Sequence, residues 1–152
     1  MHLRKLLLVS LCVLCVSCAS NRPSGYGYDK DIYDSPENQY KIGYRYLLGQ
    51  GGPINYSEAL VYFNKAANDG NRYAQNELGY LYAAGKGVPK NYHTAILWYT
   101  KASAQNLASA QYNLGMMYAD GLGTPVDKNK AMELFRKSAD QGFAPARRAL
   151  GQ

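Results

Sequence analysis

"LGYLYAAGKGVPKNYHTAILWYTKA", the stretch from Leu78 to Ala102, decides the fold of this chain. Thirty-six residues further on, from Leu114, the sequence runs "LGMMYADGLGTPVDKNKAMELFRKS", which keeps the same spacing of glycine, proline and alanine. Gly43 stands at the corresponding place one period earlier, and Gly151 one period after Gly115. A regular period of this length is typical of proteins built from stacked helical hairpins. The chain is therefore predicted to be all-α.

Each copy of the repeat predicts two helices joined by a glycine-rich turn. In the second copy, apolar residues recur at helical spacing from about residue 73 to residue 84. Gly85 and Gly87 are expected to end this helix, because positive φ costs little only for glycine. Asn91 is a good N-cap for the second helix. Three residues are expected to close the hairpins in the left-handed conformation: Gly70, Asn106 and Gly142.

The chain is expected to form an α-solenoid of stacked helix-turn-helix repeats. Three repeats of 36 residues cover about residues 37–72, 73–108 and 109–144, and a partial fourth at 145–152 supplies a capping helix. Because one hairpin cannot bury its own apolar face, the repeats must share a core. We expect the recurring motif tyrosines and the single tryptophan in that core: Tyr46, Tyr82, Tyr118 and Trp98.

The N-terminal segment, residues 1–17, is typical of an export signal. A basic start, Arg4 and Lys5, precedes an apolar run that is too short to span a bilayer as a helix. The residues up to Cys18 resemble the lipobox of bacterial lipoproteins, which implies cleavage before Cys18 and lipid attachment to its sulfur. More than one acyl chain anchors a protein stably to a membrane. The alternative is ordinary cleavage after Ala19, since small residues stand at both required positions.

Residues 18–36 are expected to form the lipidated N-terminus and a flexible linker. Gly, Pro, Ser and Asp dominate the segment, and no helical or alternating pattern survives in it. Flexible-chain scaling gives it a reach of roughly 20–25 Å, so it would hold the domain about that far from the membrane. All three cysteines lie at or before residue 18, so the folded domain is predicted to have no disulfide.

Charge and side-chain chemistry exclude several classes of function. The net charge of +6 falls to +4 without Arg4 and Lys5, and the other basic residues are scattered, whereas a nucleic-acid binder concentrates them on one face. His93 is the only histidine after the export signal, and we expect it at the surface. Without a cysteine or a second histidine, the domain can assemble neither a nucleophile dyad nor a zinc site. We therefore predict no enzyme activity, no cofactor, no metal and no nucleic-acid partner.

The repeated motif has the pattern A-x-x-x-L-G-x-x-Y-x-x-G-x-G-V-x-x-[ND]-x-x-x-A-x-x-W-Y-x-K-A. It resembles the Sel-one-like repeat, a relative of the tetratricopeptide repeat. Thirteen residues of the second copy carry the match: Ala74, Leu78, Gly79, Tyr82, Gly85, Gly87, Val88, Asn91, Ala95, Trp98, Tyr99, Lys101 and Ala102. The resemblance covers the chain from about Glu37 to its end. It implies a solenoid whose concave side, lined mainly by first helices, binds peptides or proteins.

Helical spacing predicts which side chains line this concave groove. The packing stripe uses positions such as Ala74 and Leu78, so positions two residues further along point away from it. The predicted protein-binding residues are Tyr40, Tyr44, Asn76, Tyr80, Tyr112 and Met116. Uncharged aromatic, amide and thioether groups suit a peptide ligand. The alternative is that these side chains pack against the second helix of the previous repeat.

These features predict a lipid-anchored scaffold protein of the bacterial cell envelope, on the periplasmic or surface face of the outer membrane. If the lipobox is not used, the protein is secreted or periplasmic. The alternative function is a hydrolase acting on cell-wall or β-lactam substrates, an activity linked to some cysteine-rich proteins of the repeat family. No general acid, base or nucleophile constellation in the sequence supports that alternative.

Overall fold

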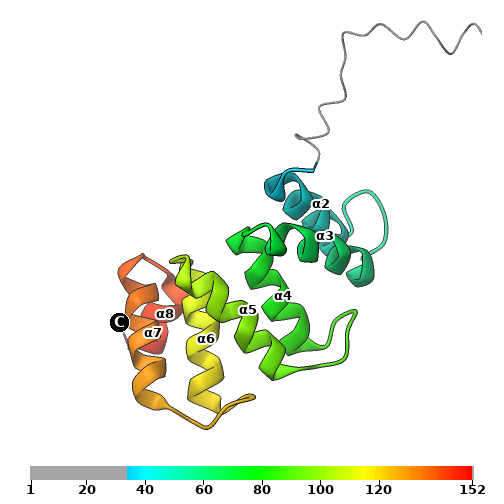
Figure 1. Cartoon of the computed structure of the whole chain (residues 1–152). Helices are drawn as coiled ribbons and strands as arrows, with labels where there is room; N and C mark the ends of the chain where they lie inside the picture. The colour runs from blue at the N-terminus through cyan, green and yellow to red at the C-terminus, as the bar shows by residue number, and fades with distance from the viewer. Residues whose placement is uncertain (1–33, 152) are drawn as a thin grey trace, which may run out of the picture. The chain divides into compact units, whose positions relative to one another are not determined.

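The computed structural model describes residues 34–151 of the chain. The predicted export signal, Cys18 and the linker as far as residue 33 lie outside the described residues. The described part forms seven α-helices (Figure 1): α2 (Pro36–Leu48), α3 (Tyr56–Asn68), α4 (Arg72–Ala84), α5 (Tyr92–Ala104), α6 (Ala108–Asp120), α7 (Lys128–Asp140) and α8 (Ala144–Ala149). No strand occurs among these residues, which confirms the all-α class.

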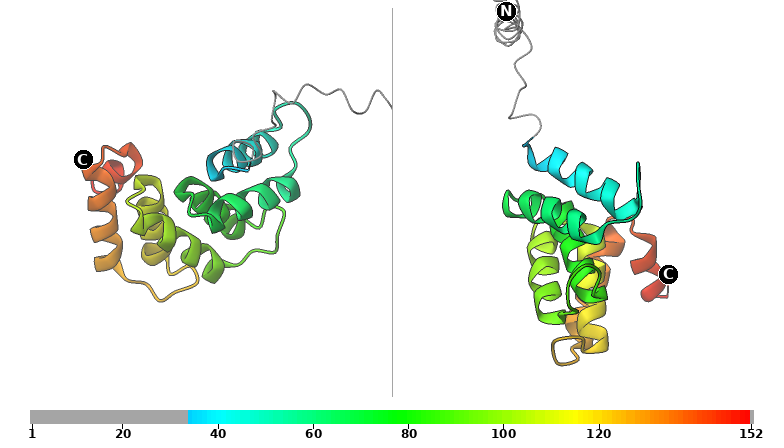
Figure 2. Two further views of the ribbon diagram at one scale, coloured as in Figure 1. Left: turned by 45° about the horizontal axis from the view of Figure 1, so that its top comes forward. Right: turned by 90° about the vertical axis from the view of Figure 1, so that its right-hand side faces the viewer.

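Consecutive helices pair as hairpins. α2 packs on α3, α4 on α5 and α6 on α7, and the second helix of each pair packs on the first helix of the next. The short α8 packs on α7, as expected for a partial capping helix. Figure 2 shows from two further directions that the hairpins follow one another in chain order. The stacked-repeat α-solenoid is confirmed.

The helix boundaries follow from local side-chain chemistry. Asn55, Asn91 and Asp127 cap the second helices, and each side chain accepts a hydrogen bond from the backbone N–H three residues later. At the other end of the hairpin, Asn106 is the one non-glycine residue with positive φ in the described range, at 58°. Asparagine tolerates this conformation better than most residues. The predicted caps and hairpin ends are therefore confirmed.

Each hairpin closes around a contact between a glycine and an aromatic ring. A Cβ placed on Gly79 would lie 2.5 Å from two ring carbons of Tyr99, and the equivalent glycines meet Phe63 and Phe135 in the same way. Tyr99 is buried, and Ala95 on the same helix is completely buried. The close approach of the two helices therefore depends on glycine at this position.

The motif tyrosines and the tryptophan were predicted to lie in the core, but they are less buried than that prediction requires. Tyr46 is 37% exposed, and Tyr82, Tyr118 and Trp98 are half-buried at the border of the core. The deeply buried position lies one residue earlier and is filled by Leu81 in the second repeat and Met117 in the third. A large ring with a polar hydroxyl is better accommodated at the border of a core, where its hydroxyl reaches water.

Buried glutamines join the two helices of a hairpin, which the sequence reasoning missed. Gln75, near the start of α4, accepts a 2.8 Å hydrogen bond from Gln105, the residue after α5. Gln111 accepts a 2.7 Å hydrogen bond from Gln141 in the next hairpin. The 36-residue spacing of Gln75 and Gln111 was the available clue. Paired amides satisfy one another, so they can be buried at little cost.

Candidate binding face of the first helices

Side chains at helical spacing i, i+3, i+4 and i+7 on α2, α4 and α6 form what we call the first-helix face. Its members are Glu37, Tyr40, Lys41, Tyr44, Tyr73, Asn76, Glu77, Tyr80, Ser109, Tyr112, Asn113 and Met116. All six residues predicted to bind protein belong to this set. The structure gives them different surroundings, so we describe them in turn.

Tyr40 is half-buried and bridges the first and second repeats. Its ring centroid lies 5.9 Å from that of Phe63 on α3 and 5.7 Å from that of Tyr73 on α4. The Tyr44 ring lies 5.7 Å from it on the other side. Burial, with a smaller contribution from the Glu77 carboxylate, raises the pKa of Tyr40 to about 12. Tyr40 therefore remains a neutral phenol that contributes both to packing and to the surface.

Tyr44, Tyr73 and Tyr80 present their rings to solvent. They are 38%, 41% and 39% exposed. The Tyr80 hydroxyl accepts a 2.6 Å hydrogen bond from the ammonium group of Lys86, which lies in the turn after α4 and 5.0 Å from the Tyr80 ring centroid. This hydrogen bond raises the pKa of Lys86. Three exposed tyrosines on two adjacent helices make an amphipathic surface of the kind that protein partners use.

Asn76 is buried, in contrast to its neighbours on the face. Its side-chain oxygen accepts a 3.0 Å hydrogen bond from the amide of Asn113 on α6. Its own amide points to the Glu77 carboxylate at 3.4 Å, which is a long and weak hydrogen bond. Asn76 therefore connects two first helices and offers little surface of its own.

Tyr112 and Met116 extend the face onto α6, and both are half-buried. The Tyr112 ring lies 5.5 Å from the Phe135 ring and 5.6 Å from the Phe143 ring. Tyr112 thus packs between its own hairpin and the residue before α8, as Tyr40 packs between the first and second repeats. These tilted ring pairs are favourable aromatic geometries.

The sequence reasoning named six of the twelve members of the face, and Tyr73 and Glu77 are among those that it missed. Their equivalents in the other repeats have different chemistry, so a search for recurring residues passes over them: Glu37 and Ser109 for Tyr73, and Lys41 and Asn113 for Glu77. The clue was the spacing within α4, since Tyr73, Glu77 and Tyr80 follow one another at intervals of four and three.

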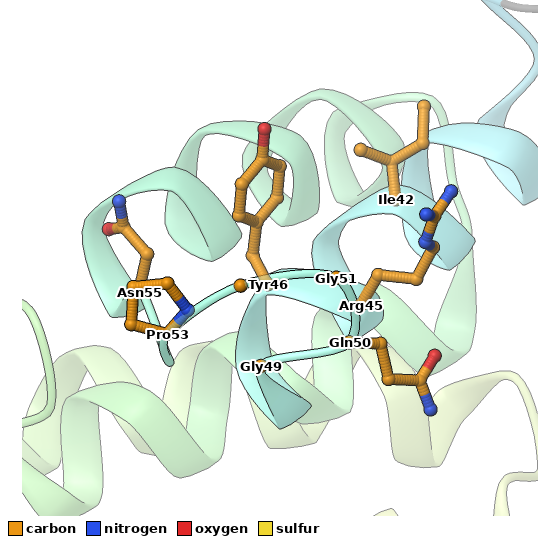
Figure 3. A pocket seen from close by; sticks show the side chains of 9 residues that line it. Ile42, Arg45, Tyr46, Gly49, Gln50, Gly51, Pro53 and Asn55 are labelled. Carbon is orange, nitrogen blue, oxygen red and sulfur yellow. The ribbon is translucent and has the colours of Figure 1, made fainter.

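A hollow of about 330 Å³ lies beside the turn that follows α2 (Figure 3). Ile42, Arg45 and Tyr46 line it from α2, and residues 49–53 line it from the turn. No residue of the first-helix face takes part. The hollow is therefore a separate feature of the first repeat.

The repeat register explains this hollow. In the second repeat, a Cβ on Gly87 would lie 2.8 Å from the Cβ of Tyr56, because the turn receives the start of the preceding second helix. In the third repeat, Gly123 is placed in the same way against Tyr92. Gly51 in the first repeat has the Arg45 guanidinium as its nearest neighbour, at 3.8 Å. The hollow thus lies where later repeats have their inter-repeat contact, and we assign it to the repeat architecture.

The described residues hold no group of three or more His, Cys, Asp or Glu side chains that could bind a metal. His93 is exposed at the start of α5, as expected. None of the helices in residues 34–151 has the length and apolar composition needed to cross a membrane.

A family model described as the Sel1 repeat matches residues 36–71, 72–107 and 108–143. The chain belongs to the Sel1 repeat family. Each matched repeat starts one residue before the boundary expected from the sequence. Sel1 repeat proteins are generally protein-interaction scaffolds, and their fold is typically non-catalytic. Comparison with curated proteins finds no match.

Solved structures with the same fold include two at more than 30% identity. One is a protective antigen present in uropathogenic Escherichia coli strains, with a TM-score of 0.75 and 37% identity over 80% of this chain and 26% of that chain. Another is a Sel1 repeat protein from Oxalobacter formigenes, with a TM-score of 0.71 and 35% identity over 80% of this chain and 92% of that one. This chain therefore spans about a quarter of the length of the first of them.

Cysteine rich protein B of Helicobacter pylori shows the same fold at lower identity. Its TM-score is 0.62 at 24% identity, over 80% of this chain and 96% of that chain. At this identity the likeness concerns the fold alone.

Proposed function

We propose that this Sel1 repeat protein is a scaffold of the bacterial cell envelope that binds a peptide or protein partner on its first-helix face. The observation that supports this proposal best is the exposure of Tyr44, Tyr73 and Tyr80 on adjacent first helices. Tyrosine supplies a large contact area with few rotatable bonds, and aromatic side chains are enriched at protein interfaces. In the proposal these rings form the concave groove on which a partner segment lies.

The packing of the half-buried tyrosines of the face supports the same proposal. Tyr40 and Tyr112 pack on Phe63 and Phe135, so the hairpins themselves hold these side chains in place. A surface that is already ordered loses little conformational entropy when a partner binds. The first-helix face therefore has the rigidity that a recognition surface needs.

The proposal places the protein at the membrane through a lipid on Cys18, with the linker as a tether. The similar Escherichia coli structure is named a protective antigen, which supports exposure of such repeats to the outside of the cell. If Cys18 carries no lipid, the same repeats act as a secreted or periplasmic scaffold.

The experiment that tests this function compares two rows of equivalent positions in the full chain. The photo-crosslinking residue p-benzoylphenylalanine is placed at one position at a time on the first-helix face: Tyr44, Tyr80 or Met116. The matched control row lies at equivalent positions on the second helices: Val61, Leu97 and Glu133. Val61 and Leu97 are 48% and 64% exposed, so they are at least as accessible as the first row.

Irradiation in the bacterium that makes the protein is expected to give one discrete adduct from positions 44 and 80. The same adduct should be absent, or about tenfold weaker, from positions 61 and 97. Equal adducts from both rows, or adducts from the second helices alone, would place binding elsewhere and refute the proposed function.

A further inference from the structure

Glu77 occupies the middle of the first-helix face, and no lysine or arginine within residues 34–151 forms an ion pair with it. It is half-buried on α4, and its only hydrogen bond within the described residues comes from the adjacent Asn76 amide at 3.4 Å. The ion pairs in the described part of the chain are Lys41–Glu37 and Lys137–Glu133, so Glu77 belongs to neither. Burial raises its pKa, and only the Asn76 hydrogen bond opposes that rise. A carboxylate in this position is partly desolvated and poorly compensated.

Two tyrosines lie on the same side of α4 as Glu77, and the Glu77 charge acts on two more tyrosines on neighbouring helices. Tyr73 and Tyr80 lie four residues before and three residues after Glu77, on the same side of α4. Tyr40 on α2 is close enough for the Glu77 charge to raise the pKa of its hydroxyl. The Glu77 charge also acts on the buried Tyr99 of α5. On α4 the carboxylate thus shares one side of the helix with two substantially exposed tyrosines.

The combination of a carboxylate and tyrosine faces is suited to an organic cation. The carboxylate supplies the opposite charge, and the ring faces attract ammonium or guanidinium groups through the cation–π interaction. The two rings already make this contact with cations of the chain itself: the Arg72 guanidinium lies 5.1 Å from the Tyr73 ring centroid, and the Lys86 ammonium lies 5.0 Å from that of Tyr80. An apolar or anionic segment bound over Glu77 would instead bury the charge without compensation.

We propose that Glu77, with Tyr73 and Tyr80, binds the side chain of a lysine or arginine that the protein partner places on the first-helix face. This inference rests on the proposed function, because it assumes that a partner occupies this face. It adds the chemistry of the contact: a cation held by one carboxylate and flanked by two phenol rings. The equivalent positions Lys41 and Asn113 carry no negative charge, so the site occurs once, in the second repeat.

A pair of short peptides tests the inference on the full chain. The probe is acetyl-Ala-Ala-Lys-Ala-Ala-amide, and the matched control has norleucine in place of lysine, which keeps the apolar stem and removes the charge. Nuclear magnetic resonance follows the Glu77 side-chain carboxyl carbon and the backbone amides of Tyr73 and Tyr80 during each titration. The pH analysis includes the charged and titratable groups near the site: Glu37 and Lys41 on α2, Arg72 and Lys86 beside the Tyr73 and Tyr80 rings, and the phenols of Tyr40 and Tyr99.

The lysine peptide is expected to shift these resonances to saturation and to lower the pKa of Glu77, because a bound cation favours the ionised carboxylate. The norleucine peptide should bind about tenfold more weakly, which corresponds to about 1.4 kcal/mol. Glu77→Gln should remove the preference for lysine, and Glu133→Gln, which removes an exposed carboxylate on α7, should leave it intact. A thermal melt of each variant checks that the fold is retained.

Equal binding of the two peptides, absence of shifts at residues 73, 77 and 80, or a lysine preference that survives Glu77→Gln would each overturn the inference. The crosslinking experiment separates this failure from that of the proposed function. If position 80 still gives a discrete adduct while the lysine preference is absent, the cation site is refuted and the proposed function is retained.

Discussion

The Asn113 amide donates a 3.0 Å hydrogen bond to the side-chain oxygen of Asn76, which lies one repeat earlier on the neighbouring first helix. At the previous junction, the rings of Tyr40 and Tyr73 are in contact between α2 and α4. The first helices of consecutive repeats therefore touch one another through side chains of the first-helix face. A partner that spans two repeats meets a continuous surface.

The contact between Gly79 and Tyr99 predicts that Gly79→Ala destabilises the protein. The added Cβ would lie 2.5 Å from two carbons of the buried Tyr99 ring, and such overpacking costs typically about 1–3 kcal/mol. This cost outweighs the gain of about 1 kcal/mol in helix propensity only if the ring resists displacement. Urea unfolding gives the change in the free energy of unfolding.

Gly52→Ala is the control for this substitution. A Cβ on Gly52 has no neighbour within 4 Å, and the φ angle of Gly52 is not positive. The variant should therefore unfold like the native protein. A Gly79→Ala variant as stable as Gly52→Ala would show that the two helices can separate without cost.

We expect replacement of Ser138 by alanine to lower stability as well, by a modest amount. Alanine occupies the equivalent position in the first two repeats, so the sequence alone gives the Ser138 hydroxyl no particular role. In the structure the buried Ser138 hydroxyl donates a 2.7 Å hydrogen bond to the carbonyl oxygen of Ala108. Ser138→Ala should therefore lower the free energy of unfolding by about 1 kcal/mol. Ser57→Ala, at an exposed position of α3, should have no measurable effect, and equal effects of the two variants would contradict the assignment.

Glu77 predicts a dependence of stability on pH. Burial raises its folded-state pKa above the ordinary value of 4.5, so just above pH 4.5 the folded protein binds more protons than the unfolded chain. The contribution of Glu77 to stability is therefore complete below pH 4.5 and declines as the pH rises through the raised pKa. Glu77→Gln should abolish this decline.

The measurement compares urea unfolding of the native protein and Glu77→Gln at pH 4 and pH 7, because the other carboxylates cancel in the difference. The variant should gain stability relative to the native protein on going from pH 4 to pH 7. A difference that is independent of pH, or one that changes in the opposite direction, would show that the carboxylate is well solvated.

The proposed lipid on Cys18 predicts that Cys18→Ala releases the protein from the membrane. In cell fractionation, the native chain should appear in the membrane fraction and the variant in the soluble fraction. Cys15→Ala is the matched control, and it should remain in the membrane fraction. A native chain found in the soluble fraction would favour cleavage after Ala19.

The sequence predicted the fold well because its turns are encoded by single residues. Asn91 caps α5 through its own side chain, and Asn106 adopts the left-handed conformation that few other residues tolerate. Helix ends of this kind depend on local chemistry. Because each cap recurs in the other repeats, the repeats confirm one another's helix boundaries. The expected first helix of the second repeat, about residues 73–84, differs from the observed α4 by one residue.

The surface of the repeats was harder to predict. Leu81 and not Tyr82 fills the deep core, and the apolar spacing of α4 alone does not distinguish the two adjacent positions. Glu77 and Tyr73 escaped notice because a search for recurring residues discards positions that differ between repeats. Such positions are where the repeats can specialise, so the candidate site depends on contacts between helices that periodicity does not reveal.

The central claim is that the exposed tyrosines of the first-helix face bind a partner while contributing little to the fold. The direct measurement introduces Tyr80→Ala into the chain that carries the crosslinking residue at position 44, and records both the thermal melt and the adduct yield. Leu97→Ala serves as the exposed control on a second helix, and Leu78→Ala as the buried control, with an expected loss of about 2–5 kcal/mol.

Tyr80→Ala should change the free energy of unfolding by less than about 1 kcal/mol, as for other exposed side chains, and should reduce the adduct about tenfold. Leu97→Ala should leave both quantities unchanged. A melt for Tyr80→Ala that falls as far as that of Leu78→Ala, or an adduct that persists at full yield, would contradict the account.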